Sequence, residues 1–168
     1  MLFRSFAFTL NGPVAIRYPK GSSSLSALHG APIKLGKAEV LKKGRDLAIV
    51  AVGSMVETAM ETASLLSKKR IEATVVDARF IKPLDEELLS DICGGIKKVV
   101  TIEEGVLEGG FGSSVLEFIE RTSMKGVTVR RVGLPPKFIE HGKREELFSK
   151  YNLTPTGICD VIINEVIR

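Results

Sequence analysis

The sequence predicts an α/β protein: a three-layer α/β/α sandwich around a mostly parallel, five-stranded sheet with one antiparallel strand. Short apolar runs, typical of strands buried on both faces, alternate with segments whose apolar residues recur at helical spacing. Successive parallel strands need crossover connections, which place helices on both faces of the sheet. The alternation continues through residues 35–168, so we expect one folded domain there.

The start of the chain has a different pattern. Residues 1–10 resemble the end of a helix, Gly12-Pro13 would break it, and Val14-Ala15-Ile16 predicts a short buried strand. The following segment is rich in Ser, Gly and Ala, which indicates a linker. The sequence thus divides into the end of a preceding domain (1–21), a linker (22–34) and the folded domain (35–168).

Within the folded domain, turn-forming residues bound each expected element. The expected strands are residues 37–41, 47–52, 74–76, 99–102 and 127–132. Helices are expected after Ser54, a candidate N-cap, and then at residues 85–92, 115–119, 143–150 and 155–167. The first two strands flank Gly44, which predicts that they form an antiparallel hairpin.

Composition argues against several classes of function. The 168 residues carry a net charge of +4, but the basic residues are scattered and no aromatic residues are interleaved with them. We therefore expect no nucleic-acid partner. No apolar run approaches membrane-spanning length, so no membrane partner is expected. Cys93 and Cys159 form no CxxC pair, which argues against zinc and favours a cytoplasmic location.

Charged residues gather where the predicted parallel strands end. In open α/β sheets, ligands bind at that carboxyl edge. The residues expected there are Ser54, Asp77, Arg79, Glu103, Glu104 and the loop 105–112. Two interpretations are open: a small-molecule site, or loops whose charges reach water, of which the second is favoured. Neighbouring strand residues point to opposite faces, so Glu103 and Glu104 are not expected to share a proton.

The loop Gly109-Gly110-Phe111-Gly112-Ser113 lies between a strand and a helix. Such a loop can bind phosphate through free N–H groups at the helix start. It matches neither GxGxxG nor GxxxxGK[ST], and the nearby glutamates would repel an anion. A tight turn with close helix–sheet packing is therefore the favoured interpretation.

Two further residues are candidates for chemistry. His141 lies before a predicted helix without an assignable Ser or Cys partner, so a contact at the helix entry is favoured over a catalytic base. His29 lies in the linker and is expected to be solvated. Arg17 follows the apolar Val14–Ile16 run, and its guanidinium suits either a phosphate or a structural ion pair.

Four stretches resemble the 1-deoxy-D-xylulose-5-phosphate synthase family, in the same order and spacing. They are residues 12–21 (GPVAIRYPKG), 76–85 (VDARFIKPLD), 103–113 (EEGVLEGGFGS) and 133–142 (GLPPKFIEHG). The second and fourth stretches separate this family from transketolases and from the beta subunits of 2-oxoacid dehydrogenases. The resemblance implies a transketolase C-terminal-like domain, preceded by the end of a pyrimidine-binding domain.

The resemblance also implies a reaction: pyruvate is condensed with glyceraldehyde 3-phosphate, and carbon dioxide is released, in the supply of isoprenoid, thiamine and pyridoxal precursors. In that family thiamine diphosphate, Mg²⁺ and the catalytic histidines belong to earlier regions. No catalytic, cofactor-binding or metal-binding residue is therefore assigned here, and no cofactor is expected on this piece. Only Arg17 is carried over, as the residue that binds the phosphate of the acceptor.

The expected partners are the N-terminal and pyrimidine-binding domains and, in the full-length enzyme, a second copy. The chain alone is expected to be inactive, with a structural or docking role at the edge near Asp77, Glu103 and Gly109. Two alternatives remain open: a stand-alone interaction module of the same fold, and the beta subunit of a 2-oxoacid dehydrogenase.

Overall fold

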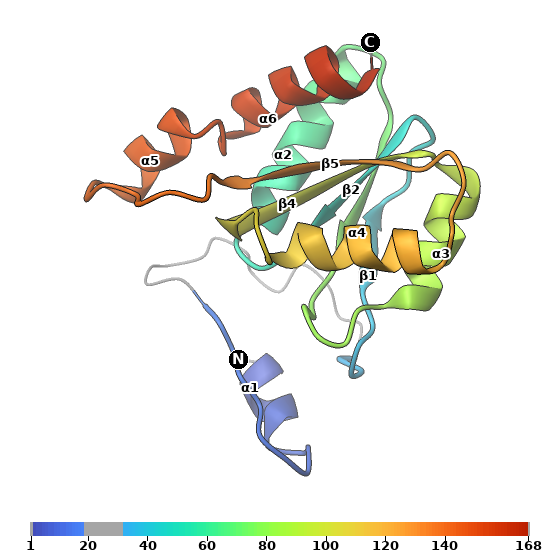
Figure 1. Ribbon diagram of the computed structural model, residues 1–168, viewed down its shortest axis with the longest axis vertical. Coiled ribbons are helices and arrows are strands. Elements are labelled where there is room, and N and C mark those ends of the chain that lie inside the picture. The colour runs from blue at the N-terminus through green and yellow to red at the C-terminus, as the bar shows by residue number, and fades with distance from the viewer. Residues whose placement is uncertain (1, 19–31, 168) are drawn as a thin grey trace.

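Five apolar segments pair into one sheet in a computed structural model that describes residues 2–18 and 32–167. In chain order the strands are β1 (Glu39–Lys42), β2 (Leu47–Ala51), β3 (Ala73–Asp77), β4 (Lys98–Val106) and β5 (Thr128–Leu134). Across the sheet they run β1-β3-β2-β4-β5, with β1 antiparallel to β3 and all other pairs parallel. The predicted fold class is confirmed, including the single antiparallel strand (Figure 1).

The predicted hairpin between the first two strands is wrong. The strand β3 lies between β1 and β2, so β1 pairs with β3 instead. Every residue of β2 is buried, which suits a central strand, whereas the half-buried β1 suits an edge. Gly44 carries the chain past the start of β3, and its N–H donates to the Thr74 hydroxyl (2.9 Å).

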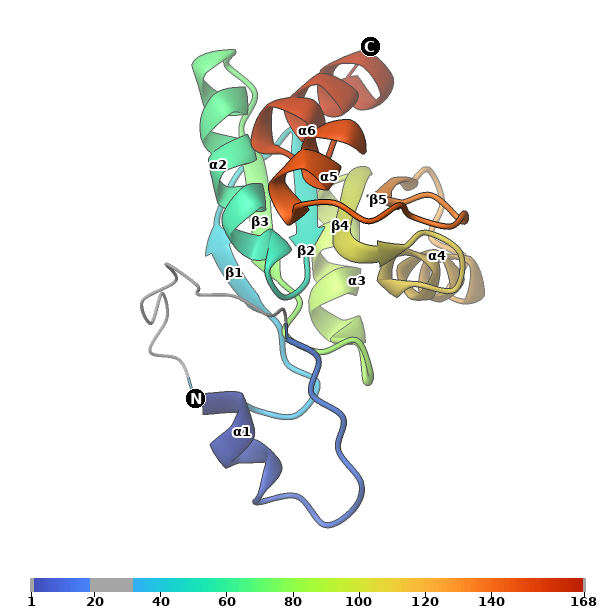
Figure 2. The ribbon, with the colours of Figure 1, turned by 90° about the vertical axis from the view of Figure 1, so that its left-hand side faces the viewer.

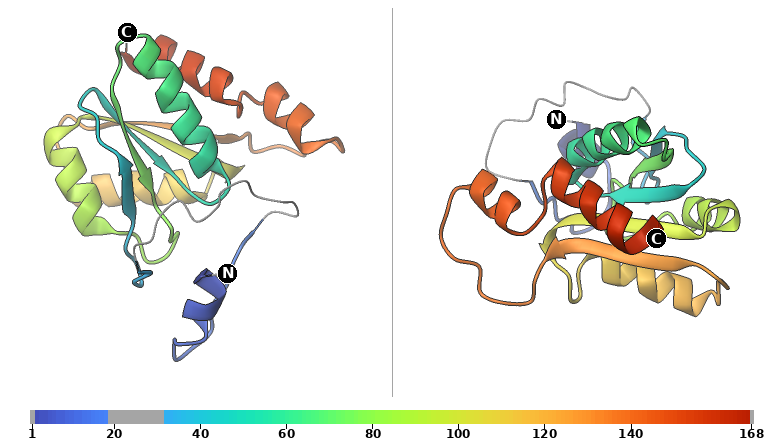
Figure 3. Two further views of the ribbon diagram at one scale, coloured as in Figure 1. Left: turned by 180° about the vertical axis from the view of Figure 1, so that it is seen from behind. Right: turned by 90° about the horizontal axis from the view of Figure 1, so that it is seen from above.

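Helices cover both faces of the sheet, as Figures 2 and 3 show. One face is covered by α2 (Met55–Lys68), α6 (Pro155–Ile162) and the π-helical turn η1 (Ile163–Ile167). The other face is covered by α3 (Glu86–Gly95) and α4 (Phe111–Arg121). The helix expected at residues 155–167 is thus present, with a π-helical last turn.

Two hydrophobic clusters form the core, one on each face. Alternate residues of a strand point to opposite faces, so each central strand contributes side chains to both clusters. The cluster under α2 and α6 includes Ile49, Val75 and Val100. The cluster under α3 and α4 includes Val50, Val76 and Val99. The three central strands are therefore buried on both sides, as their continuous apolar runs predict.

The first segment of the chain contacts this body at few points. It begins with helix α1 (Leu2–Ala7), confirming the predicted helical start. The rings of Phe3 and Phe6 meet Phe80 edge-on, with centroids 5.8 and 6.3 Å away. The buried strand predicted at Val14–Ile16 is wrong: these residues form no strand, and Val14 and Ile16 are 46% and 42% exposed. Most of the predicted linker, residues 22–31, lies outside the described residues.

The helix α5 (Arg144–Lys150) follows a long extended connection after β5 and lies away from the sheet (Figure 1). It agrees with the helix predicted at residues 143–150. Among the described helices, none combines the length and apolar character that crossing a bilayer requires.

Gly44 is expected to tolerate no side chain. A Cβ there would lie 2.3 Å from the Ala73 carbonyl carbon, which is backbone and cannot move aside. We predict that Gly44→Ala lowers the free energy of unfolding by about 2 kcal/mol in urea titrations. The matched control is Gly94→Ala, where the new Cβ meets nothing within 4 Å and helix propensity favours alanine. Equal unfolding midpoints for the two variants would contradict this account of the turn.

Candidate functional site

The carboxyl ends of the parallel strands meet at one edge of the sheet, where the sequence places its candidate residues. Near the end of β4, the pairing with β5 is interrupted between Ile102 and Val106. Pairing with β2 ends at Ile102 as well. Residues 103–105 therefore form an irregular, bulge-like stretch of β4 before the pairing with β5 resumes at Val106.

Glu103 points toward α4 and caps its amino end. Only 4% of this residue is exposed. Its two carboxylate oxygens accept hydrogen bonds from the main-chain N–H groups of Phe111 and Gly112, both at 2.8 Å. The N–H groups that a phosphate would need are thus already bonded to a protein carboxylate.

The glycines of the loop make this cap possible. A Cβ at Gly110 would lie 2.4 Å from Glu103 Oε2, and one at Gly112 would lie 2.5 Å from Thr101 Oγ1. The favoured packing interpretation of residues 109–113 is confirmed, because side chains at these positions would displace the carboxylate or collide with β4.

Glu104 points to the opposite face, as strand alternation predicts, and binds two other elements. Ser54 donates its hydroxyl hydrogen to Glu104 Oε2 (2.7 Å). Arg144 makes a bidentate contact through Nε (2.9 Å) and Nη2 (2.7 Å). This contact with Arg144 is the main reason why the pKa of the Glu104 carboxyl is lowered, with Ser54 adding to it and burial opposing it. Ser54 occupies the N-cap position of α2, as predicted, but its side chain makes no cap hydrogen bond and binds Glu104 instead.

Arg17 reaches the same place from the first segment of the chain. Its Nη2 donates to the main-chain carbonyl oxygen of Glu104 at 2.6 Å. The residue is otherwise exposed. The predicted strand before Arg17 is absent, yet the guanidinium still lies at the carboxyl edge of the folded domain.

Asp77 and Arg79 form a closed ionic cluster with β1. The Arg79 side chain is 8% exposed and pairs with Glu39, and its Nε lies 4.0 Å from Asp77 Oδ2. The main-chain N–H of Arg79 also donates to Asp77 Oδ1 (2.9 Å), and its φ is +56°. The left-handed backbone at a non-glycine residue is compatible with such local side-chain bonding.

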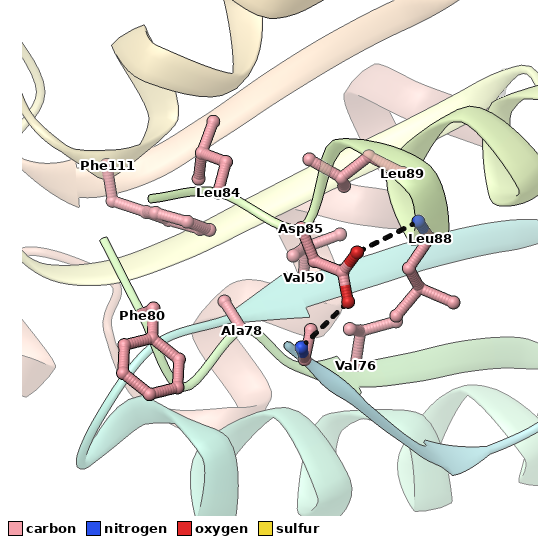
Figure 4. A pocket seen from close by; sticks show the side chains of 10 residues that line it. Val50, Val76, Ala78, Phe80, Leu84, Asp85, Leu88, Leu89 and Phe111 are labelled. Atoms are coloured by element: carbon pink, nitrogen blue, oxygen red, sulfur yellow. Dashed lines mark hydrogen bonds between the residues drawn. The ribbon is translucent and has the colours of Figure 1, made fainter. Parts of the chain in front are cut away.

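Figure 4 shows a small cavity between the loop after β3 and α3. Its volume is about 10 Å³, room for about one water and not for a substrate. Asp85 lines it and accepts hydrogen bonds from the N–H groups of Leu88 (3.2 Å) and Ala38 (3.0 Å). Asp85 caps α3, as predicted, and also ties the segment before β1 to the domain.

His141 is exposed. Its neighbour Glu140 accepts a hydrogen bond from Tyr151 Oη (2.9 Å) and pairs with Lys150, which lowers the pKa of Glu140 to about 2. His29 lies outside the described residues. Cys93 and Cys159 are free and buried, and burial raises the pKa of both thiols.

The described residues offer no fit for the cofactor of the resembled family. Within residues 2–18 and 32–167, no group of three or more His, Cys, Asp or Glu side chains could hold a metal ion. The amino end of α4, where a diphosphate could bind, is occupied by Glu103.

The functional residue that the sequence interpretation missed is Arg144. It lies in the first turn of α5, where the helix dipole disfavours a cation. A basic residue at that position is a signal that its charge is balanced by an acid from elsewhere in the fold. The partner, Glu104, is 40 residues away and could not be chosen from local patterns.

Comparisons with known proteins agree with this architecture. Residues 36–158 match the family described as "Transketolase, C-terminal domain". The chain is 49% identical to 1-deoxy-D-xylulose-5-phosphate synthase of Gloeobacter violaceus and 45% identical to that of Halothermothrix orenii. These matches cover 90% and 88% of this chain but 24% of each relative, so the chain spans about a quarter of their length.

Solved structures show the same fold. A split-gene transketolase described as an inactive beta4 tetramer aligns with a TM-score of 0.76 and 31% identity, over 89% of this chain and 46% of its own. The transketolase of Campylobacter jejuni aligns with a TM-score of 0.59 over 77% of this chain and 19% of its own; at 19% identity it supports the fold alone.

Removing the buried cap should destabilise the domain. We predict that Glu103→Ala lowers the free energy of unfolding by about 3 kcal/mol, because two N–H groups at the start of α4 lose their acceptor inside the protein. The control is Glu108→Ala, an exposed glutamate in the same loop, with a change below about 0.5 kcal/mol. Similar urea midpoints for both variants would contradict the capping role.

The Glu140 contacts predict an acid-sensitive loop. The folded-state pKa of about 2 lies below the ordinary 4.5, so the contacts stabilise the loop fully above pH 4.5, and this contribution is lost as the pH falls toward 2. NMR titration of the Glu140 carboxyl carbon should give a midpoint near 2, and Lys150→Ala should move it toward 4.5. Lys143→Ala, on the same connection, should leave it in place; an unchanged midpoint in Lys150→Ala would refute the assignment.

Proposed function

The chain belongs to the transketolase C-terminal domain family, and from that premise we propose that it is the C-terminal part of a 1-deoxy-D-xylulose-5-phosphate synthase. The observation that carries the proposal is 49% identity over 90% of the chain to one such synthase, with similar values for others. All four stretches that resemble this family lie within the chain, including the two, at residues 76–85 and 133–142, that separate it from its cousins.

The proposed reaction joins a two-carbon unit from pyruvate to glyceraldehyde 3-phosphate and releases carbon dioxide. Thiamine diphosphate and Mg²⁺ supply the decarboxylation chemistry. The described residues do not fit these groups, so we assign both to other domains of the enzyme. This chain contributes a rigid α/β body and one substrate contact, and it acts in a cytoplasmic homodimer.

The substrate contact is Arg17, which we assign to the phosphate of the acceptor. A guanidinium carries five N–H donors in a fixed planar fork, suited to two parallel bonds with a phosphate. Among the described residues, Arg17 uses one donor, toward the Glu104 carbonyl. That bond holds the group at the sheet edge, while the exposed side of the fork faces solvent.

One comparison favours a second arrangement, in which this domain belongs to a separately encoded subunit. The split-gene transketolase chain is covered over 46% of its length with a TM-score of 0.76. That protein is a split-gene transketolase in the form of an inactive beta4 tetramer. On that precedent the domain would act as part of a separately encoded subunit that needs a partner chain for activity. A stand-alone interaction module of this fold would instead never support turnover.

The proposal predicts acceptor-dependent turnover only in the assembled enzyme. The chain would be joined to the upstream domains of its gene, or mixed with them as a separate chain, with thiamine diphosphate, Mg²⁺ and pyruvate. Carbon dioxide release should require glyceraldehyde 3-phosphate. Arg17→Ala should raise the KM for that acceptor by about 100-fold, the loss of a bidentate charged contact, and leave the KM for pyruvate nearly unchanged.

The matched control is Arg4→Ala, an exposed arginine of the same segment, which should leave both KM values unchanged. Turnover with a sugar phosphate donor in place of pyruvate would favour a transketolase. If no supplied partner gives turnover, the chain would instead be assigned as an interaction module.

A further inference from the structure

Glu104 connects three separate parts of the chain. Its side chain binds Ser54, which precedes α2, and Arg144, which opens α5. Its main-chain carbonyl binds Arg17, from the first segment. We call these four residues the Glu104 network. Any change in where Glu104 sits is therefore transmitted directly to the guanidinium of Arg17.

The backbone at Glu104 lies in an irregular stretch of the sheet. The register of β4 with β2 ends at Ile102, and its register with β5 shifts between Ile102 and Val106, so no residue of β2 or β5 stands in register opposite the carbonyl that holds Arg17. Gly105 follows directly and has no side chain to brace the chain. Two carboxylates add restraints to this stretch: Glu103 bonded to α4, and Glu104 bonded to Ser54 and Arg144.

Arg144 is the strongest of these restraints on Glu104. A bidentate guanidinium–carboxylate contact is stronger and more directional than a single neutral hydrogen bond. The Glu104 side chain is 25% exposed, so solvent screens this pair less than a fully exposed one. The Arg144 guanidinium also lies over the Phe148 ring, 4.2 Å from its centroid, which orients it before it meets the carboxylate.

We propose that the Glu104–Arg144 ion pair is a positioning device for Arg17: it fixes the irregular stretch of β4 between Ile102 and Val106, whose Glu104 carbonyl orients the guanidinium toward the acceptor phosphate. Arg144 is then a positioning residue that does not touch the substrate. The inference rests on the proposed function for the role of Arg17, while the positioning itself is a property of this chain. The ion pair makes the affinity for the acceptor depend on Arg144 of α5, whereas the affinity for the donor does not depend on it.

The positioning can be measured on the chain without activity. The probe is the order parameter of the Arg17 Nε–H bond from NMR relaxation. A held guanidinium should give a value above about 0.8, and Arg144→Gln should lower it below about 0.6. The matched control, Arg121→Gln, breaks the exposed Arg121–Glu86 ion pair on the other face and should change nothing at Arg17.

Two further variants keep this test decisive. Arg144→Lys retains the charge but not the bidentate fork, so the order parameter should fall to an intermediate value. Ser54→Ala removes one hydrogen bond to Glu104 and leaves α5 untouched, so it should lower the Arg17 order parameter by a smaller amount. This variant still tests the proposal if Arg144→Gln unfolds the chain. An Arg17 order parameter that stays high in Arg144→Gln and in Ser54→Ala would overturn the proposal.

In the assembled enzyme the same device should act on one substrate. Arg144→Gln should raise the KM for glyceraldehyde 3-phosphate about fivefold, with kcat and the KM for pyruvate nearly unchanged. Added to Arg17→Ala it should cause no further rise, because the positioned group is gone. Equal losses for both substrates, or additive effects, would show that Arg144 only stabilises α5.

The two proposals fail in different ways. A wild-type enzyme without acceptor-dependent carbon dioxide release contradicts the proposed function, and the order parameters still decide the positioning. A wild-type enzyme with that activity, in which Arg144→Gln leaves both Arg17 order and acceptor KM unchanged, keeps the function and rejects the positioning device.

Discussion

The two-residue period of a β-strand is the constraint on which this site depends. It sends two adjacent carboxylates, Glu103 and Glu104, to opposite faces where the pairing of β4 with β2 ends and its register with β5 shifts. One is buried against the amino end of α4, and the other binds Ser54 and Arg144 across the other face. The last part of β4 is thus braced by side chains on both faces of the sheet. This brace explains why a glycine-rich loop, a serine and a distant arginine converge there.

The brace also explains what the carboxyl edge does not do. In many open α/β sheets this edge holds the ligand, often at the start of a helix. Here the protein's own carboxylate occupies that position, and the nearby cavity, with a volume of about 10 Å³, has room for no more than about one water. The edge therefore serves as support for a residue delivered by another segment. That role agrees with a domain that spans about a quarter of the length of its curated relatives.

Local patterns were sufficient for the elements and insufficient for their long-range contacts. Apolar runs and helical spacing located all five strands and the helices of the folded domain, most clearly the central strands β2, β3 and β4, where burial on both faces leaves little room for polar residues. The predicted hairpin across Gly44 was wrong because β3 lies between β1 and β2 in the sheet. That order is decided by how the three strands pack together. The strand at Val14–Ile16 failed because an apolar triplet needs a neighbouring strand to pair with. Arg144 was missed because its partner lies on another element.

The central claim is that this domain supports an acceptor-phosphate contact made by Arg17. The most direct measurement is a crystal structure of the assembled enzyme with glyceraldehyde 3-phosphate bound. The account predicts phosphate oxygens within about 3 Å of the Arg17 guanidinium, with the Glu104–Arg144 pair intact beside it. A phosphate bound instead at the start of α4, with Glu103 displaced from the N–H groups of Phe111 and Gly112, would contradict the account.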